Sequence, residues 1–238
     1  DLSTYFGEYE GSFVLYDLEN DAWSIHNKDH ATLRVAPNST YKIYDALFGL
    51  EEGVITPENS FIAWNGEIYP FEAWNADQTL QSAMNSSVNW YFQTVDEQLG
   101  ASDVYSYIQE IGYGNENMSG DFSTYWMESS LEISPIEQVE LLAKLQNNSF
   151  GFAPENISTV KDAICLSSSD AGTFYGKTGT GRVNGQYVNG WFIGYIETAD
   201  NTYFFATNIS ADSDATGGNA TEITMSILSD MNIWVSQK

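Results

Sequence analysis

At Pro37-Asn38-Ser39-Thr40-Tyr41-Lys42 the chain changes from strand patterning to helix patterning. Proline and a small polar residue are typical of the first positions of a helix. The apolar residues that follow recur at helical spacing, and they are Ile43, Leu47 and Leu50. Because Gly53 is suited to end a helix, we predict a helix from about Pro37 to Leu50.

Strand patterning occupies the two ends of the chain. Residues 12–16 form a β-type run, and a polar turn at 18–21 leads into a second run, as in a hairpin. Further β-type runs follow in the last third, at residues 172–176, 189–196 and 202–206. A last helix is expected from about Ala220 to Met231.

The middle of the chain, about residues 55–165, is expected to be mostly helical. Leu80, Met84 and Val88 recur at the spacing of one helix face, and Pro135 opens a later helix. Strands at both ends with helices between them predict an α/β (α+β) fold with one central antiparallel sheet flanked by helices. Since no repeat or linker interrupts the chain, we expect residues 1–238 to form one domain.

Composition excludes several classes of function. The 238 residues include 8 Lys and Arg against 33 Asp and Glu, a formal charge of −25. A chain so acidic offers no basic face for nucleic acid or for an anionic membrane surface. No apolar run approaches the roughly 18 residues of a membrane span, and no signal peptide is recognisable. The lone Cys165 allows no internal disulfide, and no Cys/His spacing predicts a metal site.

Ser39 and Lys42 are candidates for a nucleophile and its base. A serine hydroxyl needs a base beside it, and residues three apart on a helix are neighbours. The helix N-terminus also favours negative charge, so an oxyanion formed during attack would be stabilised there. Taken alone, the same two residues fit an ordinary helix-cap serine and a solvated lysine equally well.

Two further motifs bring polar groups that suit an anionic substrate. Lys177-Thr178-Gly179 follows a β-type run, where a lysine and a hydroxyl suit a carboxylate and glycine permits close approach. Ser86-Ser87-Val88-Asn89 offers a second hydroxyl that could relay a proton. Alone, each motif also fits a turn after a strand or the start of a helix.

Together these motifs resemble the penicilloyl-serine transferase group, above all the class D β-lactamases and the β-lactam sensor-transducers of the BlaR/MecR type. The resemblance covers about residues 10–235 and rests on the order and spacing of many short matches. They are Ser39-Thr40-Tyr41-Lys42, Trp64-Asn65-Gly66, Ser87-Val88-Asn89-Trp90-Tyr91-Phe92-Gln93, Tyr113-Gly114-Asn115, Trp126-Met127-Glu128-Ser129-Ser130-Leu131, Lys177-Thr178-Gly179-Thr180-Gly181 and Asn189-Gly190-Trp191-Phe192-Ile193-Gly194.

The resemblance implies a role for each site residue. Ser39 would be acylated by the lactam carbonyl, with Lys42 as the base, either as a free amine or carboxylated by CO2. Ser87 would pass the proton to the lactam nitrogen. Lys177, Thr178, Gly179 and Thr180 would form the substrate-binding strand, with an oxyanion hole from the backbone N–H groups of Ser39 and Thr180. Trp126 would contact the modified lysine, although a core aromatic is an equally good reading. No other cofactor and no metal are implied.

Asn89 is the position expected to separate sensing from turnover. Class D enzymes typically carry an apolar residue there, which keeps the lysine pocket dry and favours a neutral lysine and its carbamate. We expect the Asn89 amide to hydrogen bond Lys42, to disfavour the carbamate after acylation and so to preserve the acyl-protein. The alternative register Ser86-Ser87-Val88 would restore an apolar residue. The family often adds a late arginine for the drug carboxylate, and none follows Arg182 here.

The resemblance therefore favours a covalent β-lactam sensor domain over an enzyme with turnover. A class D β-lactamase is the alternative, and a transpeptidase relative is a third reading. The implied partners are β-lactam antibiotics together with the membrane and zinc-protease portions of a full-length receptor. The implied location is the extracellular face of a bacterial plasma membrane, or the medium if the protein is secreted.

Overall fold

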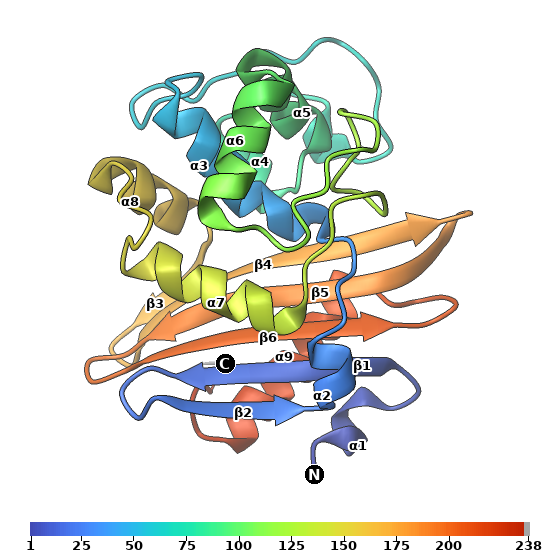
Figure 1. Ribbon diagram of the computed structural model, residues 1–238, viewed down its shortest axis with the longest axis vertical. Helices are drawn as coiled ribbons and strands as arrows, with labels where there is room; N and C mark the ends of the chain where they lie inside the picture. Colours follow the sequence, from blue (N-terminus) through green and yellow to red (C-terminus); the bar gives the residue numbers. More distant parts are fainter. Residues whose placement is uncertain (236–238) are drawn as a thin grey trace.

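A six-stranded antiparallel sheet in the order β2-β1-β6-β5-β4-β3 runs through the computed structural model, which describes residues 1–235 (Figure 1). Its strands are β1 (Glu10–Asp17), β2 (Ala22–His26), β3 (Cys165–Ser169), β4 (Gly172–Val183), β5 (Gln186–Glu197) and β6 (Thr202–Ser210). The N-terminal hairpin joins the C-terminal strands through β1 and β6, where Val14 pairs with Ala206. The predicted central sheet is therefore confirmed, and the exposed edge strand β3 is an element that the sequence did not reveal.

Helices cover both faces of the sheet. Helix α9 (Gly217–Asp230) packs on β4, β5 and β6 together with the short α1 (Ser3–Phe6), and buries Ile223, Ile227 and Leu228. Helix α7 (Pro135–Gln146) packs across β1, β5 and β6 on the opposite face, near α2 (Lys28–Ala31). The last helix thus begins three residues before the predicted Ala220, because the Thr216 hydroxyl caps it by accepting from the Asn219 N–H.

The other helices gather beyond β4, in the upper part of Figure 1. They are η1 (Asn38–Tyr41), α3 (Lys42–Glu51), η2 (Glu72–Trp74), α4 (Leu80–Asn85), α5 (Asn89–Leu99), α6 (Ala101–Ile111) and α8 (Pro154–Ala163). Leu80, Met84 and Val88 are all buried, but α4 ends at Asn85 and Val88 precedes α5. They therefore share a core and not one helix face. Residues 112–134, expected to be largely helical, form a long loop.

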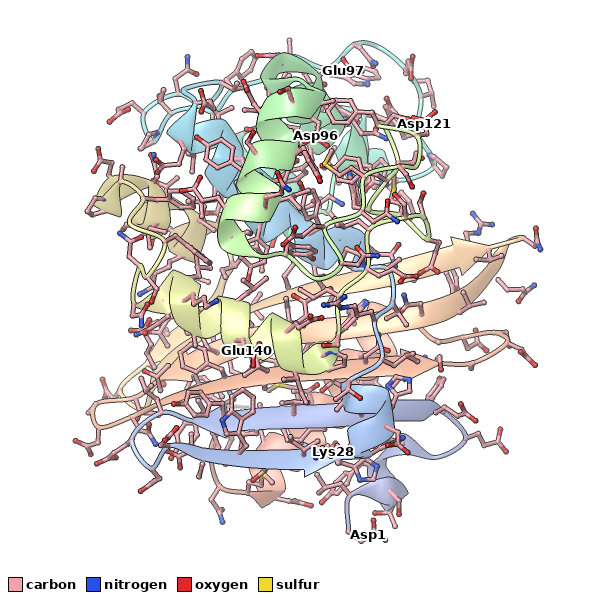
Figure 2. All side chains as sticks on the ribbon, in the orientation of Figure 1. Asp1, Lys28, Asp96, Glu97, Asp121 and Glu140 are labelled. Atoms are coloured by element: carbon pink, nitrogen blue, oxygen red, sulfur yellow. The ribbon has the colours of Figure 1, made fainter. Side chains whose placement is uncertain are left out.

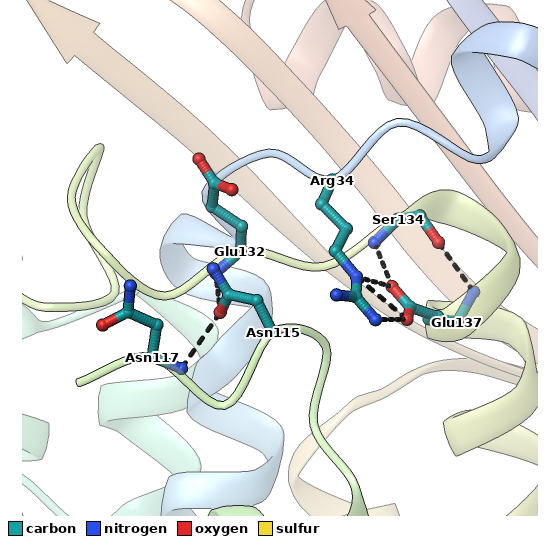
Figure 3. Close-up of polar contacts among 6 residues, drawn as sticks. All are labelled: Arg34, Asn115, Asn117, Glu132, Ser134 and Glu137. Carbon is teal, nitrogen blue, oxygen red and sulfur yellow. Dashed lines mark hydrogen bonds and ion pairs between the residues drawn. The ribbon is translucent and has the colours of Figure 1, made fainter.

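Contacts with the loop at 112–134 and with the first turn of α7 hold the segment before Ser39 in place. Val35 and Ile133 exchange two backbone hydrogen bonds. Figure 3 shows the Arg34 guanidinium on the Glu137 carboxylate, at 2.6 Å, and the capping box in which Ser134 and Glu137 begin α7. Asn115 Oδ1 accepts from the backbone N–H of Glu132 and holds the loop closed. These contacts fix the position at which the chain enters η1.

The first turn of the predicted helix is a 3-10 turn that lies directly on β4. An added Cβ at Gly179 would stand 2.9 Å from the Pro37 carbonyl oxygen and 3.3 Å from the Ser39 nitrogen. Only glycine permits this approach of two backbones. The helix then runs as α3 to Glu51, close to the predicted end, and Gly53 follows with a φ of 70°.

Candidate active site

A pocket of about 370 Å³ lies where η1, the start of α5, the loop at 126–128 and β4 meet. Most of the residues predicted from the sequence line it, namely Ser39, Ser87, Asn89, Trp126, Thr178, Gly179 and Thr180. The remaining two, Lys42 and Lys177, are buried directly behind this wall, and they contact Ser39 and Ser87 respectively. The fold therefore brings the predicted residues together from four separate parts of the chain.

The Lys42 amine joins the hydroxyl of Ser39 to the amide of Asn89. Lys42 Nζ lies 2.6 Å from Ser39 Oγ and 2.6 Å from Asn89 Oδ1. An amide oxygen can only accept, so the amine donates to Asn89 and, when neutral, keeps its lone pair for the Ser39 hydroxyl proton. This geometry suits the removal of a proton from Ser39.

Burial favours the neutral form of the Lys42 amine, which is the form that can accept a proton. Its side chain is completely buried, and its Nζ lies 4.5 Å from the centre of the Trp126 ring and 5.6 Å from that of Phe92. Desolvation, with a smaller contribution from the charge of Lys177, holds the pKa of the Lys42 amine well below its usual value, and Asp45 opposes the shift. Trp126 Nε1 is also buried and donates to no residue of the part that the structure describes.

Ser87 sits between the pocket and the second buried lysine. Lys177 Nζ donates to Ser87 Oγ and, at 3.0 Å, to the Thr178 carbonyl oxygen. Desolvation lowers the pKa of Lys177 to about 7. Lys177 thus contacts the proposed relay hydroxyl, which its sequence motif alone did not indicate. The placement also settles the register, because Ser87 faces the pocket with Asn89, whereas the Ser86 carbonyl accepts from the Trp74 indole.

The outer wall of the pocket is the end of β4. Thr178 and Thr180 lie on it, and Thr180 Oγ1 accepts from the Gly217 N–H at 2.9 Å. Arg182 also lines the pocket, with its guanidinium carbon 5.8 Å from the centre of the Tyr187 ring. Within residues 1–235 it forms no ion pair. In the sequence, Arg182 stands out only because it is one of 8 basic residues in the chain.

Glu128 is a pocket residue that sequence reasoning did not single out. Its Oε1 accepts from Asn38 Nδ2 at 2.8 Å and from Asn189 Nδ2 at 2.7 Å, and so ties η1 to β5. An added Cβ at Gly181 would lie 1.9 Å from the same oxygen. Asn38, Ser87 and Glu128 all have positive φ angles, of 49°, 52° and 42°. Such backbone strain is typical of functional sites that the surrounding structure holds in place.

The remaining wall is apolar. Phe71 and Trp74 line the pocket with ring centroids 5.0 Å apart, and Met127 faces the same space. Phe71 is 56% exposed, so it presents apolar surface to an incoming molecule. Polar groups on one side and aromatic rings on the other suit a small amphipathic anion.

No group of three or more His, Cys, Asp or Glu residues within 1–235 is arranged to hold a metal ion. Over the same range, no helix has both the length and the apolar character needed to cross a bilayer. Cys165 is exposed and forms no disulfide there.

Comparisons with known proteins agree with this geometry. Residues 11–229 match the penicillin-binding protein transpeptidase domain family. The chain is 47% identical to the regulatory protein BlaR1 of Bacillus licheniformis over 238 residues, which cover 99% of the chain and 39% of that protein. It spans about two fifths of the length of the BlaR1 and MecR1 relatives that it matches.

Solved structures give the same result. The C-terminal domain of the Bacillus licheniformis BlaR penicillin-receptor superposes with a TM-score of 0.95 at 46% identity, over 99% of this chain and 96% of that one. The class D β-lactamase BAT-2 superposes with a TM-score of 0.93 at 35% identity, over 99% of this chain and 97% of that one.

Proposed function

The chain belongs to the penicillin-binding protein transpeptidase domain family, in the group that holds the BlaR/MecR sensor domains and the class D β-lactamases, and on that premise we propose that it is a β-lactam sensor domain. It binds penicillins or cephalosporins covalently at Ser39 and releases them slowly. The observation that carries the proposal is the Asn89 amide oxygen 2.6 Å from the Lys42 amine.

Acylation follows from the contacts of Lys42 and Ser87. The neutral Lys42 amine takes the Ser39 proton as Ser39 Oγ forms an ester bond with the lactam carbonyl carbon. The backbone N–H groups of Ser39 and Thr180 stabilise the oxyanion. The carbon–nitrogen bond of the ring breaks, and the leaving nitrogen takes the hydroxyl proton of Ser87. A protonated Lys177 replaces that proton through its contact with Ser87 Oγ, so Lys42 keeps the proton that it took from Ser39. Lys177, which donates to Ser87 Oγ, orients that hydroxyl.

Recognition of the drug carboxylate falls to the end of β4. Thr178 and Thr180 supply hydroxyls, and Lys177 supplies positive charge from behind the wall. Arg182 adds a cation at the rim of the same pocket. Against a formal charge of −25, these groups create the local positive field that an anion requires. The aromatic wall of Phe71 and Trp74 receives the apolar part of the drug.

Persistence of the ester follows from Asn89. Hydrolysis requires a base that activates water beside the acyl group. The amide oxygen of Asn89 favours the protonated amine, so once Ser39 is esterified Lys42 stays protonated and cannot take a proton from water. Water then remains inactive, and the adduct lasts long enough to be a signal.

Carboxylation of Lys42 by CO2 is part of the proposal for the resting protein only. A carbamate would supply a carboxylate base, and the unpartnered Trp126 Nε1 is a suitable donor for one of its oxygens. By contrast, Asn89 Oδ1 is a hydrogen-bond acceptor, so it would repel the carbamate oxygens. The residues therefore accommodate the group at rest, and Asn89 opposes its return after acylation.

The setting of the domain is also proposed. The BlaR1 and MecR1 relatives are considerably longer than this chain. We place the domain on the extracellular face of a bacterial plasma membrane, as part of a receptor with membrane and zinc-protease portions.

One experiment separates the sensor from the enzyme. The protein is mixed with a chromogenic cephalosporin, and product release and intact mass are followed together. The sensor gives a burst of one equivalent and a lasting mass increase. Steady turnover of many equivalents would instead identify a class D β-lactamase, to which the fold similarity is also high.

A further inference from the structure

Two aspartates lie buried side by side beneath the lysine pocket. Asp45 of α3 is 0% exposed and Asp96 of α5 is 1% exposed, and the two side chains are neighbours where these helices pack together. Figure 2 labels Asp96 in the helical part of the molecule, next to the exposed Glu97. Within residues 1–235, no hydrogen-bond donor reaches either carboxyl oxygen of Asp45 or the Oδ1 atom of Asp96. Two carboxylates in contact cannot both be ionised, so one of them carries a proton.

Helices α3 and α5 supply both the contact between Lys42 and Asn89 and the contact between Asp45 and Asp96. Helix α5 presents Asn89 and Asp96, seven residues or about two turns apart, toward α3. Helix α3 presents Lys42 to Asn89, and Asp45 follows one turn later. The aspartate pair therefore lies further along the same two helices, one turn beyond Lys42 on α3 and two turns beyond Asn89 on α5, within the same buried core.

A buried hydrogen-bonded chain holds the charge of the pair on Asp96. The Tyr125 hydroxyl donates to Asp96 Oδ2 at 2.9 Å and lies 2.8 Å from the Tyr41 hydroxyl. Burial raises the pKa of Asp96 to about 6 and that of Asp45 well above its usual value, so at neutral pH Asp45 keeps the proton. The other titratable groups that interact with the pair are Lys42 and the buried tyrosines Tyr41, Tyr91 and Tyr125.

We propose that Asp45 and Asp96 share one proton and hold one negative charge beneath Lys42, and that this charge determines how readily the amine keeps a proton after acylation. The tyrosines stay neutral because burial raises the pKa of each. Asp45 is the carboxyl group whose charge acts on the Lys42 amine. Both aspartates are positioning residues, because they act through Lys42 and do not touch the drug.

The inference deepens the proposed function and rests on it. A protonated Lys42 cannot activate water against the ester, so the buried charge prolongs the acyl state together with Asn89. Removal of the charge makes the amine release its proton more easily, because an ammonium loses a nearby opposite charge. The acylation rate rises with pH as Lys42 loses its proton, and this rise (the base limb of the pH profile) then moves to lower pH. The ester is also hydrolysed faster.

The test compares two variants that differ by one carboxyl group. Asp45→Asn keeps the charge on Asp96, whereas the double variant Asp45→Asn with Asp96→Asn replaces the pair by two amides of the same shape. The rate of penicillin acylation is measured by intact mass from pH 5 to 9, and the lifetime of the adduct is measured at pH 7. The double variant should move the base limb down by roughly one pH unit relative to Asp45→Asn, and shorten the lifetime.

Equal pH profiles and equal lifetimes in the two variants would overturn the inference and leave a packing role. The unmodified protein gives an independent reading through carbon NMR of its aspartate carboxyls. One member of the pair should remain protonated at pH 7 while the other is ionised, and two ionised carboxyls would also overturn the inference. Failure of the proposed function is distinct, because the unmodified protein would then form no adduct at all.

Discussion

Lys42 and Arg182 belong to one pocket but to opposite surroundings. Lys42 lies fully buried behind Ser39, where it contacts an amide oxygen and two aromatic rings. Arg182 lies exposed at the rim, at the end of β4. A cation deprived of water gives up its proton easily and becomes a base, whereas a solvated guanidinium keeps its charge. In the proposed sensor, the inner region therefore performs the chemistry and the outer region attracts the ligand.

Lys177 lies between these extremes. It is as deeply buried as a core residue, yet its pKa of about 7 leaves it partly protonated at neutral pH. It can therefore orient Ser87 in the inner region and also contribute charge to the outer one. The following changes separate the two regions, and they are ordered by the size of the effect expected.

Ser39→Ala should abolish the reaction while leaving the outer region intact. Without the hydroxyl no ester can form, so intact mass should show no adduct after long incubation with penicillin. Equilibrium binding of penicillin, measured by calorimetry, should persist because the β4 wall is unchanged. Survival of labelling would mean that the nucleophile is misassigned.

Asn89→Val should change the inner region without touching the outer one. The amine loses the acceptor at 2.6 Å and lies in drier surroundings, so its pKa falls and a larger fraction of Lys42 is neutral and able to take a proton from water. We expect deacylation to accelerate at least about tenfold, measured as the decay of the mass adduct after excess drug is removed. An unchanged lifetime would contradict the role given to Asn89, and Asn89→Gln serves as the control because it keeps a neutral amide acceptor.

The pH dependence of binding should report the outer region alone when Ser39→Ala removes the chemistry. Lys177 is protonated below its pKa of about 7 and neutral above it, so affinity for an anionic drug should fall as pH rises. We expect the Kd to increase about three- to tenfold between pH 6 and 8. Adding Lys177→Gln should flatten the profile, and a profile that stays steep would assign the titration to another group.

Arg182→Gln should produce the smallest effect. An exposed cation contributes little to binding because water and salt screen it. In the Ser39→Ala background we expect the Kd to rise about two- to fivefold at low salt and less at high salt. A loss of affinity far beyond this range would show that Arg182 holds the carboxylate directly, at the centre of the site.

Much of the fold was predictable because its signals are local. The hairpin near the start, the helix after Ser39 and the apolar strands of the last third all carry their own periodicity and end signals. The misjudged elements lack such signals. Strand β3 is exposed along its whole length, and its serine-rich sequence has no alternation that could reveal it. Val88 fits the spacing of the preceding helix, although the chain breaks at Ser87 through a positive φ.

The sequence by itself determined that Ser39 and Lys42 are neighbours, because a spacing of three positions on a helix brings them together wherever the helix lies. Only the tertiary structure decided what these groups can do. The contact of Lys42 with Asn89 spans 47 positions, and that of Lys177 with Ser87 spans 90. The hydrogen bonds of Glu128 and the buried pair Asp45–Asp96 likewise join elements that lie far apart in the sequence. Proton affinity depends on the loss of water and on nearby charge, and both arise only when those elements pack.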